Sequence, residues 1–289
     1  MLTPISNPLT KQSYRLPEPP SFFLDKRPSI DFSGIIRSVD DPAHYKVVLV
    51  KDSPPLVRRG GSIVRSSEFL KFYVFSSDTS SWCNFLVPAP PNFLTETILD
   101  AAIGLYPTAL DGALYWCINM IMVYNLFDNV DSQHCDFIHL PQEAKNSADD
   151  LRNLHSLCIA NIEQRLWLYH WSFVTAFTQT LTVWDLKDDR TWNIKHFVDL
   201  TSINWRCKHS PSDVNVSIKG FDPYDGDVLY VFSKDDRLLS VNLRSKTVQL
   251  VFHFKSTVFP VMPHFRLFPY FPPFWPTPII KSIVATAAL

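Results

Sequence analysis

The stretch LTVWDLKDDRTW (residues 181–192) decides the fold class. It opens with a run of apolar and β-branched residues, passes through a polar turn and begins a second run, so a strand, a hairpin turn and another strand are expected. The same order of features occurs in four other stretches: ISNPLTKQSYRLP (5–17), FYVFSSDTSSW (72–82), MVYNLFDN (122–129) and LLSVNLRSKTV (238–248).

These stretches form an internal repeat. Three of them follow an upstream strand of similar composition, at DGALYW (111–116), EQRLWLYH (163–170) and DGDVLYVF (225–232). The units recur at intervals of 69, 49, 60 and 57 residues. Self-similarity at about 50 residues, with several strands per unit, is typical of β-propellers, in which each small sheet is one blade. The sequence therefore predicts an all-β, irregular β-propeller of about five or six kelch-like blades. A β-sandwich and an irregular α+β domain remain as alternatives. Aligning the units makes five positions equivalent: Ser6, Phe75, Tyr124, Trp184 and Val241.

Eight apolar runs are the clearest strand candidates, and only two short segments, 94–103 and 147–154, have a helical pattern. The expected strands are 45–50, 69–75, 113–118, 120–126, 165–170, 181–186, 228–232 and 238–243. The sequence has only 7 glycines, although tight hairpins favour this residue. Polar hairpin turns are expected at 78–81, 187–190 and 244–246.

Composition limits the classes of protein that this chain can represent. Its 289 residues suit one large domain or two small ones, and we expect a single domain, 1–289, with an aromatic and proline-rich tail at 265–289. A content of 46% hydrophobic and 19% charged residues excludes general disorder. A net charge of −1 argues against binding to nucleic acid, because nucleic-acid-binding domains usually carry a basic excess.

Nothing in the sequence directs the chain to a membrane or out of the cell. Residues 1–12 have neither a basic region nor an apolar core of the kind found in signal peptides. The most apolar stretch, 112–127, is short for a membrane span and contains Asn119 and Asn125. The cysteines are odd in number and irregularly spaced, as expected of free thiols in a reducing compartment. We therefore expect a cytoplasmic or nuclear protein with no membrane partner.

Several motifs, in their order, resemble the F-box-associated domains of plants. They are NPLTKQSYRLP (7–17), HYKVVLV (44–50), LKFYVFSSDTSSW (70–82), DGALYW (111–116) and LTVWDLKDDRTW (181–192), and PPFWPTPI (272–279) resembles a tail common among grass members. The resemblance implies a kelch-like propeller and a non-enzymatic protein–protein interaction module, like the substrate-recognition half of an F-box ubiquitin-ligase receptor. Its protein partners are not identified by the sequence. A related plant family of unknown function shares much of the pattern.

The chain departs from that family at its N-terminus. Family members that act as receptors carry an F-box, a helical segment that binds a Skp1-type adaptor, ahead of the propeller. This chain begins inside the first blade motif, so we expect it not to bind the adaptor alone. It is then either a free-standing propeller or a truncated F-box protein.

One group of residues has spacing similar to that of a structural zinc site. Cys135 and His139 form C-x3-H, and His155 and Cys158 form H-x2-C fifteen residues later, with His134 as a spare ligand. The alternative, which we adopt, places the cysteines in strands and leaves the histidines half-exposed. No metal or other cofactor is therefore expected.

No pattern of nucleophilic or acid–base catalysis is present, and we expect no enzyme. There is no G-x-S-x-G motif, and the acidic pairs at 40–41, 149–150, 188–189 and 235–236 have turn-like surroundings, in which aspartate is favoured for backbone reasons. Polar segments 54–66 and 142–153 interrupt the repeat and are candidate contact loops. The first contains the basic residues Arg58, Arg59 and Arg65, which are candidates for contacting an acidic partner.

The segment FPYFPPFWPTP (268–278) has PxxP spacing, which suits a polyproline ligand. The alternative is an extended tail that packs its aromatic residues onto the domain. Because exposed aromatic residues at this density promote aggregation, packing is the expected role.

Overall fold

The computed structural model describes most of the chain between residues 4 and 253. The described residues are 4–7, 12–18, 31–38, 44–52, 56–59, 62–65, 69–91, 107–125, 135–144, 157–173, 179–203, 216–222, 224–233 and 237–253. The predicted helices at 94–103 and 147–154 and the tail at 265–289 lie outside these residues.

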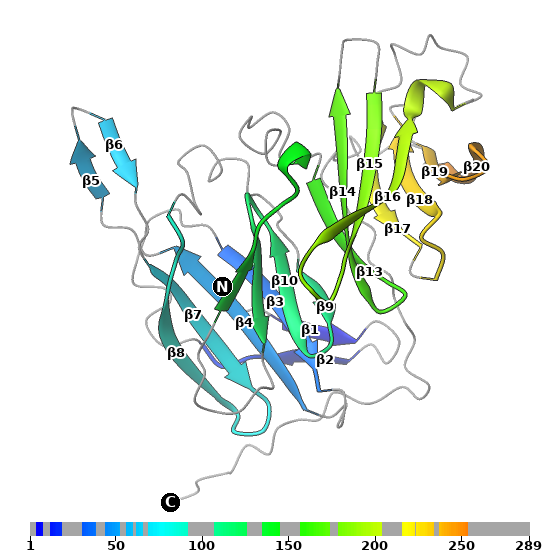
Figure 1. Ribbon diagram of the computed structural model, residues 1–289. Coiled ribbons are helices and arrows are strands. Elements are labelled where there is room, and N and C mark those ends of the chain that lie inside the picture. The colour runs from blue at the N-terminus through cyan, green and yellow to red at the C-terminus, as the bar shows by residue number, and fades with distance from the viewer. Residues whose placement is uncertain are drawn as a thin grey trace, which may run out of the picture. The chain divides into compact units, whose positions relative to one another are not determined.

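Strands dominate the described residues, and sixteen of them form four antiparallel four-stranded sheets (Figure 1). The first sheet contains β3 (Asp31–Arg37), β4 (Tyr45–Asp52), β7 (Phe69–Ser76) and β8 (Ser81–Pro88). The second contains β9 (Thr108–Leu110), β10 (Ala113–Cys117), β11 (Ile121–Asn125) and β12 (Cys135–Ile138). The third contains β13 (Leu157–Ile162), β14 (Arg165–Phe173), β15 (Gln179–Leu186) and β16 (Trp192–Asp199), and the 3₁₀ turn η2 (Leu200–Ser202) follows it. The fourth contains β17 (Val216–Phe221), β18 (Val228–Ser233), β19 (Arg237–Asn242) and β20 (Thr247–His253).

Two further pairs of strands complete the described strands. The pair β1 (Pro4–Asn7) and β2 (Gln12–Arg15) is N-terminal, and the pair β5 (Leu56–Arg59) and β6 (Ser62–Arg65) is inserted between β4 and β7. Within each four-stranded sheet the strands pair in the order of the sequence, which is the meander of a propeller blade. The all-β prediction is confirmed.

The sequence repeat corresponds to the repeat of sheets. Four of the five positions taken as equivalent lie on the third strand of a sheet and are buried: Phe75, Tyr124, Trp184 and Val241. The upstream runs at 111–116, 163–170 and 225–232 supply the second strands β10, β14 and β18. Ser6 lies on β1, in a two-stranded pair. One sequence unit therefore builds the middle of one sheet.

The tight turns use residues other than glycine in the left-handed backbone region. Glu163 and Gln164 connect β13 to β14 with φ values of 52° and 60°, and Asp111 and Gly112 connect β9 to β10 with 46° and 77°. Positive φ at both central residues is the mark of the type I′ turn, whose twist matches that of the strands it joins. The longer turns at 77–80, 187–191 and 243–246 confirm the predicted polar hairpins.

The chain divides into two compact units, and each has its own core. Unit 1 consists of residues 1–116, 122–137 and 271–289, and unit 2 of 117–121 and 138–270. This division does not test the expected single domain, which stays a prediction. No helix in the described part of the chain is long and apolar enough to cross a membrane.

In unit 1, the N-terminal pair is fixed to the first sheet by apolar packing and one hydrogen bond. Leu16, directly after β2, is buried against Tyr45, Val47 and Phe75. The indole Nε1 of Trp82 donates a hydrogen bond of 2.9 Å to the carbonyl of Pro17. A second aromatic cluster joins rings of β7, β8 and β11: Phe72, Phe85 and Tyr124, with centroids 5.0–5.8 Å apart.

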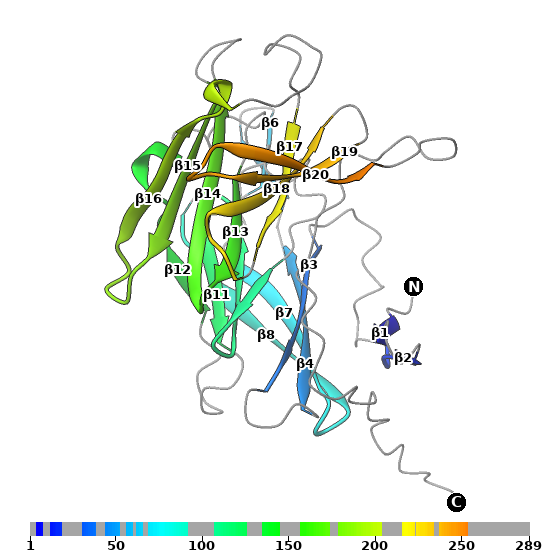
Figure 2. The ribbon, with the colours of Figure 1, turned by 90° about the vertical axis from the view of Figure 1, so that its right-hand side faces the viewer.

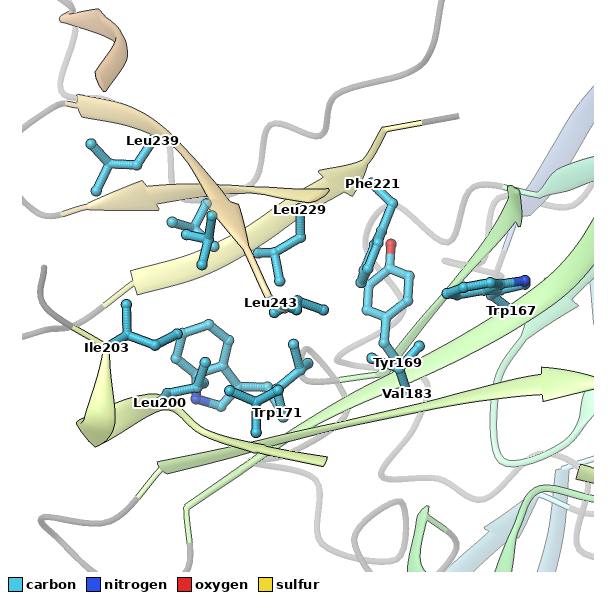
Figure 3. Close-up of a cluster of buried hydrophobic side chains, with 14 of the residues drawn as sticks. Trp167, Tyr169, Trp171, Val183, Leu200, Ile203, Phe221, Leu229, Leu239 and Leu243 are labelled. Atoms are coloured by element: carbon cyan, nitrogen blue, oxygen red, sulfur yellow. The ribbon is translucent and has the colours of Figure 1, made fainter. Parts of the chain in front are cut away.

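In unit 2, the third and fourth sheets pack face to face (Figure 3). Trp167, Tyr169 and Trp171 alternate along β14, so all three side chains lie on the face that meets the fourth sheet. The rings of Tyr169 and Phe221 lie 4.4 Å apart between their centroids. Both faces of β14 are buried, because His170, on the opposite face, is also only 4% exposed.

Gly226 approaches the indole of Trp167 so closely that no side chain fits between them. A Cβ built on Gly226 lies against Cη2 of the ring and 2.7 Å from Cζ3, closer than non-bonded carbon atoms approach. This glycine therefore sets how closely the turn between β17 and β18 approaches β14.

We expect Gly226→Ala to lower the free energy of unfolding by about 2–3 kcal/mol, since the added methyl group overpacks a rigid ring. Urea unfolding of the full chain measures this change. In a Trp167→Leu background, which removes the ring, the same substitution should cost less than half as much. Equal costs in both backgrounds would show that the contact with Trp167 is not the cause.

The imidazole of His170 is buried, and no charged residue in the described part of the chain pairs with it. Its Nε2 has no hydrogen-bond partner among the described residues, and burial lowers the pKa of His170 from 6.5 to about 4. The folded chain thus keeps this side chain neutral at a pH where the unfolded chain protonates it.

The free energy of unfolding should therefore decrease as the pH is lowered from about 6.5 to 4. Above pH 6.5 both states hold a neutral His170, and below that value the unfolded state binds a proton that the folded state excludes. We expect the wild type to lose up to about 2 kcal/mol by pH 5 relative to His170→Phe, which cannot titrate at this position. Urea unfolding at pH 7.5 and pH 5 measures the difference, and parallel losses in the two chains would contradict it.

Candidate interaction surface

The first and third connections of a four-stranded meander lie at the same end of the sheet, because neighbouring strands run in opposite directions. In unit 2 these connections are the turns at 163–164, 187–191, 222–227 and 243–246. We call them, with the side chains that contact them, the turn end of unit 2. The turns do not all meet at one point, because Lys246 Nζ lies 3.2 Å from Ser202 Oγ, which follows the end of β16 remote from the turn at 187–191. Charged residues of both signs lie on these turns, and two groups of ion pairs hold them.

The first group is centred on a buried carboxylate. The side chain of Asp185, near the end of β15, is 2% exposed, and its Oδ2 lies 3.5 Å from Arg165 Nη1 and 3.3 Å from Lys195 Nζ. A β-bulge in β16, opposite Val183 and Trp184, makes Lys195 the extra residue of that strand. Desolvating a carboxylate is costly unless cations compensate, and these two contacts supply that compensation.

Two polar atoms of this region have no hydrogen-bond partner in the described part of the chain. They are Asp185 Oδ1 and Nε1 of Trp167, which is paired with Asp185 across β14 and β15. Lys195 Nζ also lies over the Trp167 ring, 6.0 Å from a centroid, at the outer limit of a cation–π contact. The indole therefore supports both the apolar core and the charged group above it.

The second group joins the two sheets. His196 Nε2, on β16, lies 3.0 Å from Asp227 Oδ1, and Arg244 Nε lies 2.8 Å from Asp227 Oδ2. Burial lowers the pKa of His196, and the Asp227 carboxylate opposes this shift. The backbone of Asp227 is itself fixed, since its N–H donates to Asp225 Oδ1 and its carbonyl accepts from Leu243 N.

This arrangement is suited to recognition. Asp185 contacts two cations, and Asp227 contacts a cation and an imidazole of the same unit. These contacts stabilise the turns. Among the residues that the structure describes, no group of three or more His, Cys, Asp and Glu side chains is placed to hold a metal ion. The charged side chains in the turns at 187–191 and 243–246 are exposed, although Arg244 also pairs with Asp227 and Lys246 donates to Ser202.

The described residues of the suggested zinc site differ in their burial and hydrogen bonding. Cys135, on β12, is buried, its thiol donates to the carbonyl of Val123 at 3.2 Å, and burial raises its pKa well above the usual value. His139 is exposed, and its carbonyl accepts a hydrogen bond from Trp192 Nε1. Cys158 is half-buried on β13. Because His155 lies outside the described residues, this assignment stays a prediction.

The basic residues of segment 54–66 lie on the β5–β6 pair. The register places Arg58 opposite Ile63, Arg59 opposite Ser62 and Arg65 opposite Leu56. Their suggested contact with an acidic partner is untested and stays a prediction. Of segment 142–153, the structure describes only 142–144, a single helical turn.

Sequence reasoning missed the turn end, although one signal was present. Asp185 is an acidic residue inside the apolar run LTVWDL, at a position where alternation predicts burial. A charged residue at a buried strand position implies a cationic partner. The identity of its partners depends on a bulge and on cross-strand register, which the local sequence does not reveal.

Comparison with known proteins identifies the family. Residues 2–258 match the family described as "F-box protein At3g26010-like, beta-propeller". The chain belongs to this family. The resemblance to F-box-associated propellers is thereby confirmed, and the four sheets are propeller-like blades of this family.

Three solved structures are distantly similar to this At3g26010-like propeller. A crystal structure of HIRA(644-1017) matches with 14% identity and a TM-score of 0.32, over 82% of this chain and 55% of the other. The tricorn protease matches with 9% identity and a TM-score of 0.29, over 88% and 23%. YCF48 bound to D1 peptide matches with 10% identity and a TM-score of 0.25, over 78% and 85%. The chain thus spans about half of the first structure, and no curated protein matches it.

We expect Asp185→Asn to lower the free energy of unfolding by about 1–3 kcal/mol, because two charge-assisted contacts to a buried carboxylate are lost. Asp188→Asn is the matched control, since the same change at an exposed position of the neighbouring turn should stay within about 0.5 kcal/mol. Urea unfolding of both variants measures the two changes in the free energy of unfolding. Equal effects would show that the buried ion pairs do not hold the turn end.

Proposed function

We propose that this At3g26010-like propeller is a non-enzymatic protein–protein interaction module that recognises substrate proteins, as in an F-box ubiquitin-ligase receptor. The observation that carries the proposal is the turn end of unit 2, where side chains of both charges are fixed on the turns of two packed sheets. Membership of an F-box protein family supports it and suggests protein partners.

Fixed charges favour selective binding. Loops carried by a rigid scaffold are the usual place for recognition, and complementary charge sets specificity and encounter rate more than affinity. Arg165 and Lys195 are held by Asp185, and Arg244 by Asp227, so a partner orders fewer side chains on binding. Cations and anions lie side by side at this end, which suits a protein surface of mixed charge.

The proposal extends to architecture and place in the cell. We propose that the four complete sheets are four blades and that the β1–β2 pair belongs to a fifth, within a propeller of five or six kelch-like blades. Cytoplasm or nucleus is the proposed location, where ubiquitin ligases of this type act. Association with a Skp1-type adaptor requires an F-box and is an outcome of the test below.

Quantitative affinity purification from the protein's own cells tests the function. Three tagged chains are compared: the wild type, Lys187→Glu/Arg190→Glu in an exposed turn of the turn end, and Arg15→Glu/Arg37→Glu as a control of equal charge change on exposed positions of unit 1. We expect a reproducible set of proteins to be recovered with the wild type and the control and to fall at least tenfold with the turn-end variant.

The other outcomes have distinct meanings. Equal recovery with all three chains would exclude the turn end as the contact surface. Recovery of chaperones alone would overturn the proposed function. A Skp1-type adaptor and a cullin recovered with the wild type would connect the chain to a ubiquitin ligase, and their absence beside other partners would indicate a free-standing recognition module.

A further inference from the structure

The turn that joins β19 to β20 carries two cations and no acidic residue. It reads LRSK (243–246) and leads into β20, which Figure 2 shows in orange. The side chain of Arg244 is 81% exposed, and Lys246 is also exposed. A surface turn of this charge attracts an anionic group of another molecule.

The guanidinium of Arg244 is fixed from one side. Its Nε lies 2.8 Å from Asp227 Oδ2, and the other oxygen of that carboxylate lies 3.0 Å from His196 Nε2. A guanidinium has five N–H donors in a planar fork, and a single carboxylate accepts two of them in the bidentate arrangement. In the described part of the chain, no acidic residue other than Asp227 pairs with Arg244. Donors of this fixed group therefore remain for a second carboxylate.

The turn that joins β17 to β18 supports this arrangement from below. Its acidic residues use their oxygens within the turn, since Asp222 accepts hydrogen bonds from the backbone N–H of Tyr224 and the hydroxyl of Tyr230. Asp225 accepts a hydrogen bond from the backbone N–H of Asp227. These contacts fix the backbone that carries Asp227, and through Asp227 they fix Arg244.

The same turn exposes an aromatic ring. Tyr224 is 74% exposed, while its backbone N–H is held by Asp222. Tyrosine and arginine are enriched among the residues that dominate the energy of protein–protein interfaces. Neighbouring turns of the fourth sheet thus present an exposed ring and an exposed guanidinium, each on a backbone that hydrogen bonds hold in place.

We propose that Arg244 binds a side-chain carboxylate of the partner protein, that Lys246 adds a second positive charge, and that Tyr224 contacts an apolar residue of the same partner. This inference rests on the proposed function and specifies the chemistry of the partner as an acidic segment with an apolar residue close by. The planar fork matches a carboxylate, and holding it in advance lowers the cost of ordering it on binding. A phosphate group carries about −1.5 to −2 charges at pH 7, so Asp227 repels it more strongly than it repels a carboxylate.

An NMR titration of the full chain with isotope-labelled arginine tests the proposal, and acetate is the carboxylate probe. The Nε–H resonances of Arg244 and Arg15 are identified by their loss in Arg244→Lys and Arg15→Lys. Arg15 is the matched control in the same sample, because it is an exposed arginine of unit 1. We expect the half-saturating concentration of acetate to be at least fivefold lower at Arg244 than at Arg15, since the fork of Arg244 is held in advance. Inorganic phosphate at the same ionic strength should require a higher concentration than acetate.

Two results of the titration overturn the proposal. Equal responses of Arg244 and Arg15 to acetate would show that the turn at 243–246 is no more than a solvated surface. Saturation of Arg244 at a lower concentration of phosphate than of acetate would exclude a carboxylate as the preferred group and would indicate a phosphorylated partner.

Affinity purification separates the failure of this inference from the failure of the proposed function. We expect Arg244→Lys, which keeps the charge and removes the fork, to lower the recovery of partner proteins at least tenfold, and Arg15→Lys to leave it unchanged. Full recovery with Arg244→Lys would overturn the role of Arg244 and leave the recognition function in place. Recovery of chaperones alone with the wild type would overturn the function, whereas the titration with acetate needs no partner and still decides whether Arg244 binds a carboxylate.

Discussion

Unit 2 depends on the packing of one aromatic strand against a neighbouring sheet. Trp167, Tyr169 and Trp171 project from one face of β14 at every second residue, and large rings gain most from burial when they meet a complementary apolar face. Phe221 and the leucines of β18 and β19 supply that face. Because the two sheets meet through large rings, the distance between their turns is fixed, and His196 comes within hydrogen-bonding distance of Asp227.

The third sheet contains two different solutions to the problem of a buried polar side chain, one on each face. Asp185 keeps its charge, because Arg165 and Lys195 lie beside it and their own side chains remain partly in solvent. Of the residues that the structure describes, none supplies His170 with a cation or anion, and burial lowers its pKa to about 4. The two residues differ in position, since Asp185 lies near the end of β15 and His170 lies within β14 on the opposite face of the sheet.

Sequence reasoning recovered the middle of each sheet and less of its edges. The eight expected runs became the second and third strands of the four sheets, β4 and β7, β10 and β11, β14 and β15, and β18 and β19. Central strands are buried on both faces and therefore read as continuous apolar runs. Outer strands such as β16 mix apolar and polar residues, so their own sequence does not clearly indicate a strand. The repeat predicted them only as the second strand of a hairpin. The site was harder to predict. A bulge in β16 places Lys195 beside Asp185, and the contact between Asp227 and His196 joins residues of two different sheets.

The scarcity of glycine, a residue that tight hairpins favour, contributes to the character of the turn end. Glu163, Gln164, Arg190 and Lys246 all adopt positive φ there, and each costs about 1–2 kcal/mol relative to the right-handed region. Such conformations persist only where the surrounding structure determines them, in this case through paired strands and packed sheets. A glycine at these positions would relieve the strain but would carry no charge and would widen the range of turn conformations. The chain thus places charged side chains on turns that the strands hold in one conformation. Packing of the aromatic core offsets the backbone strain of these turns.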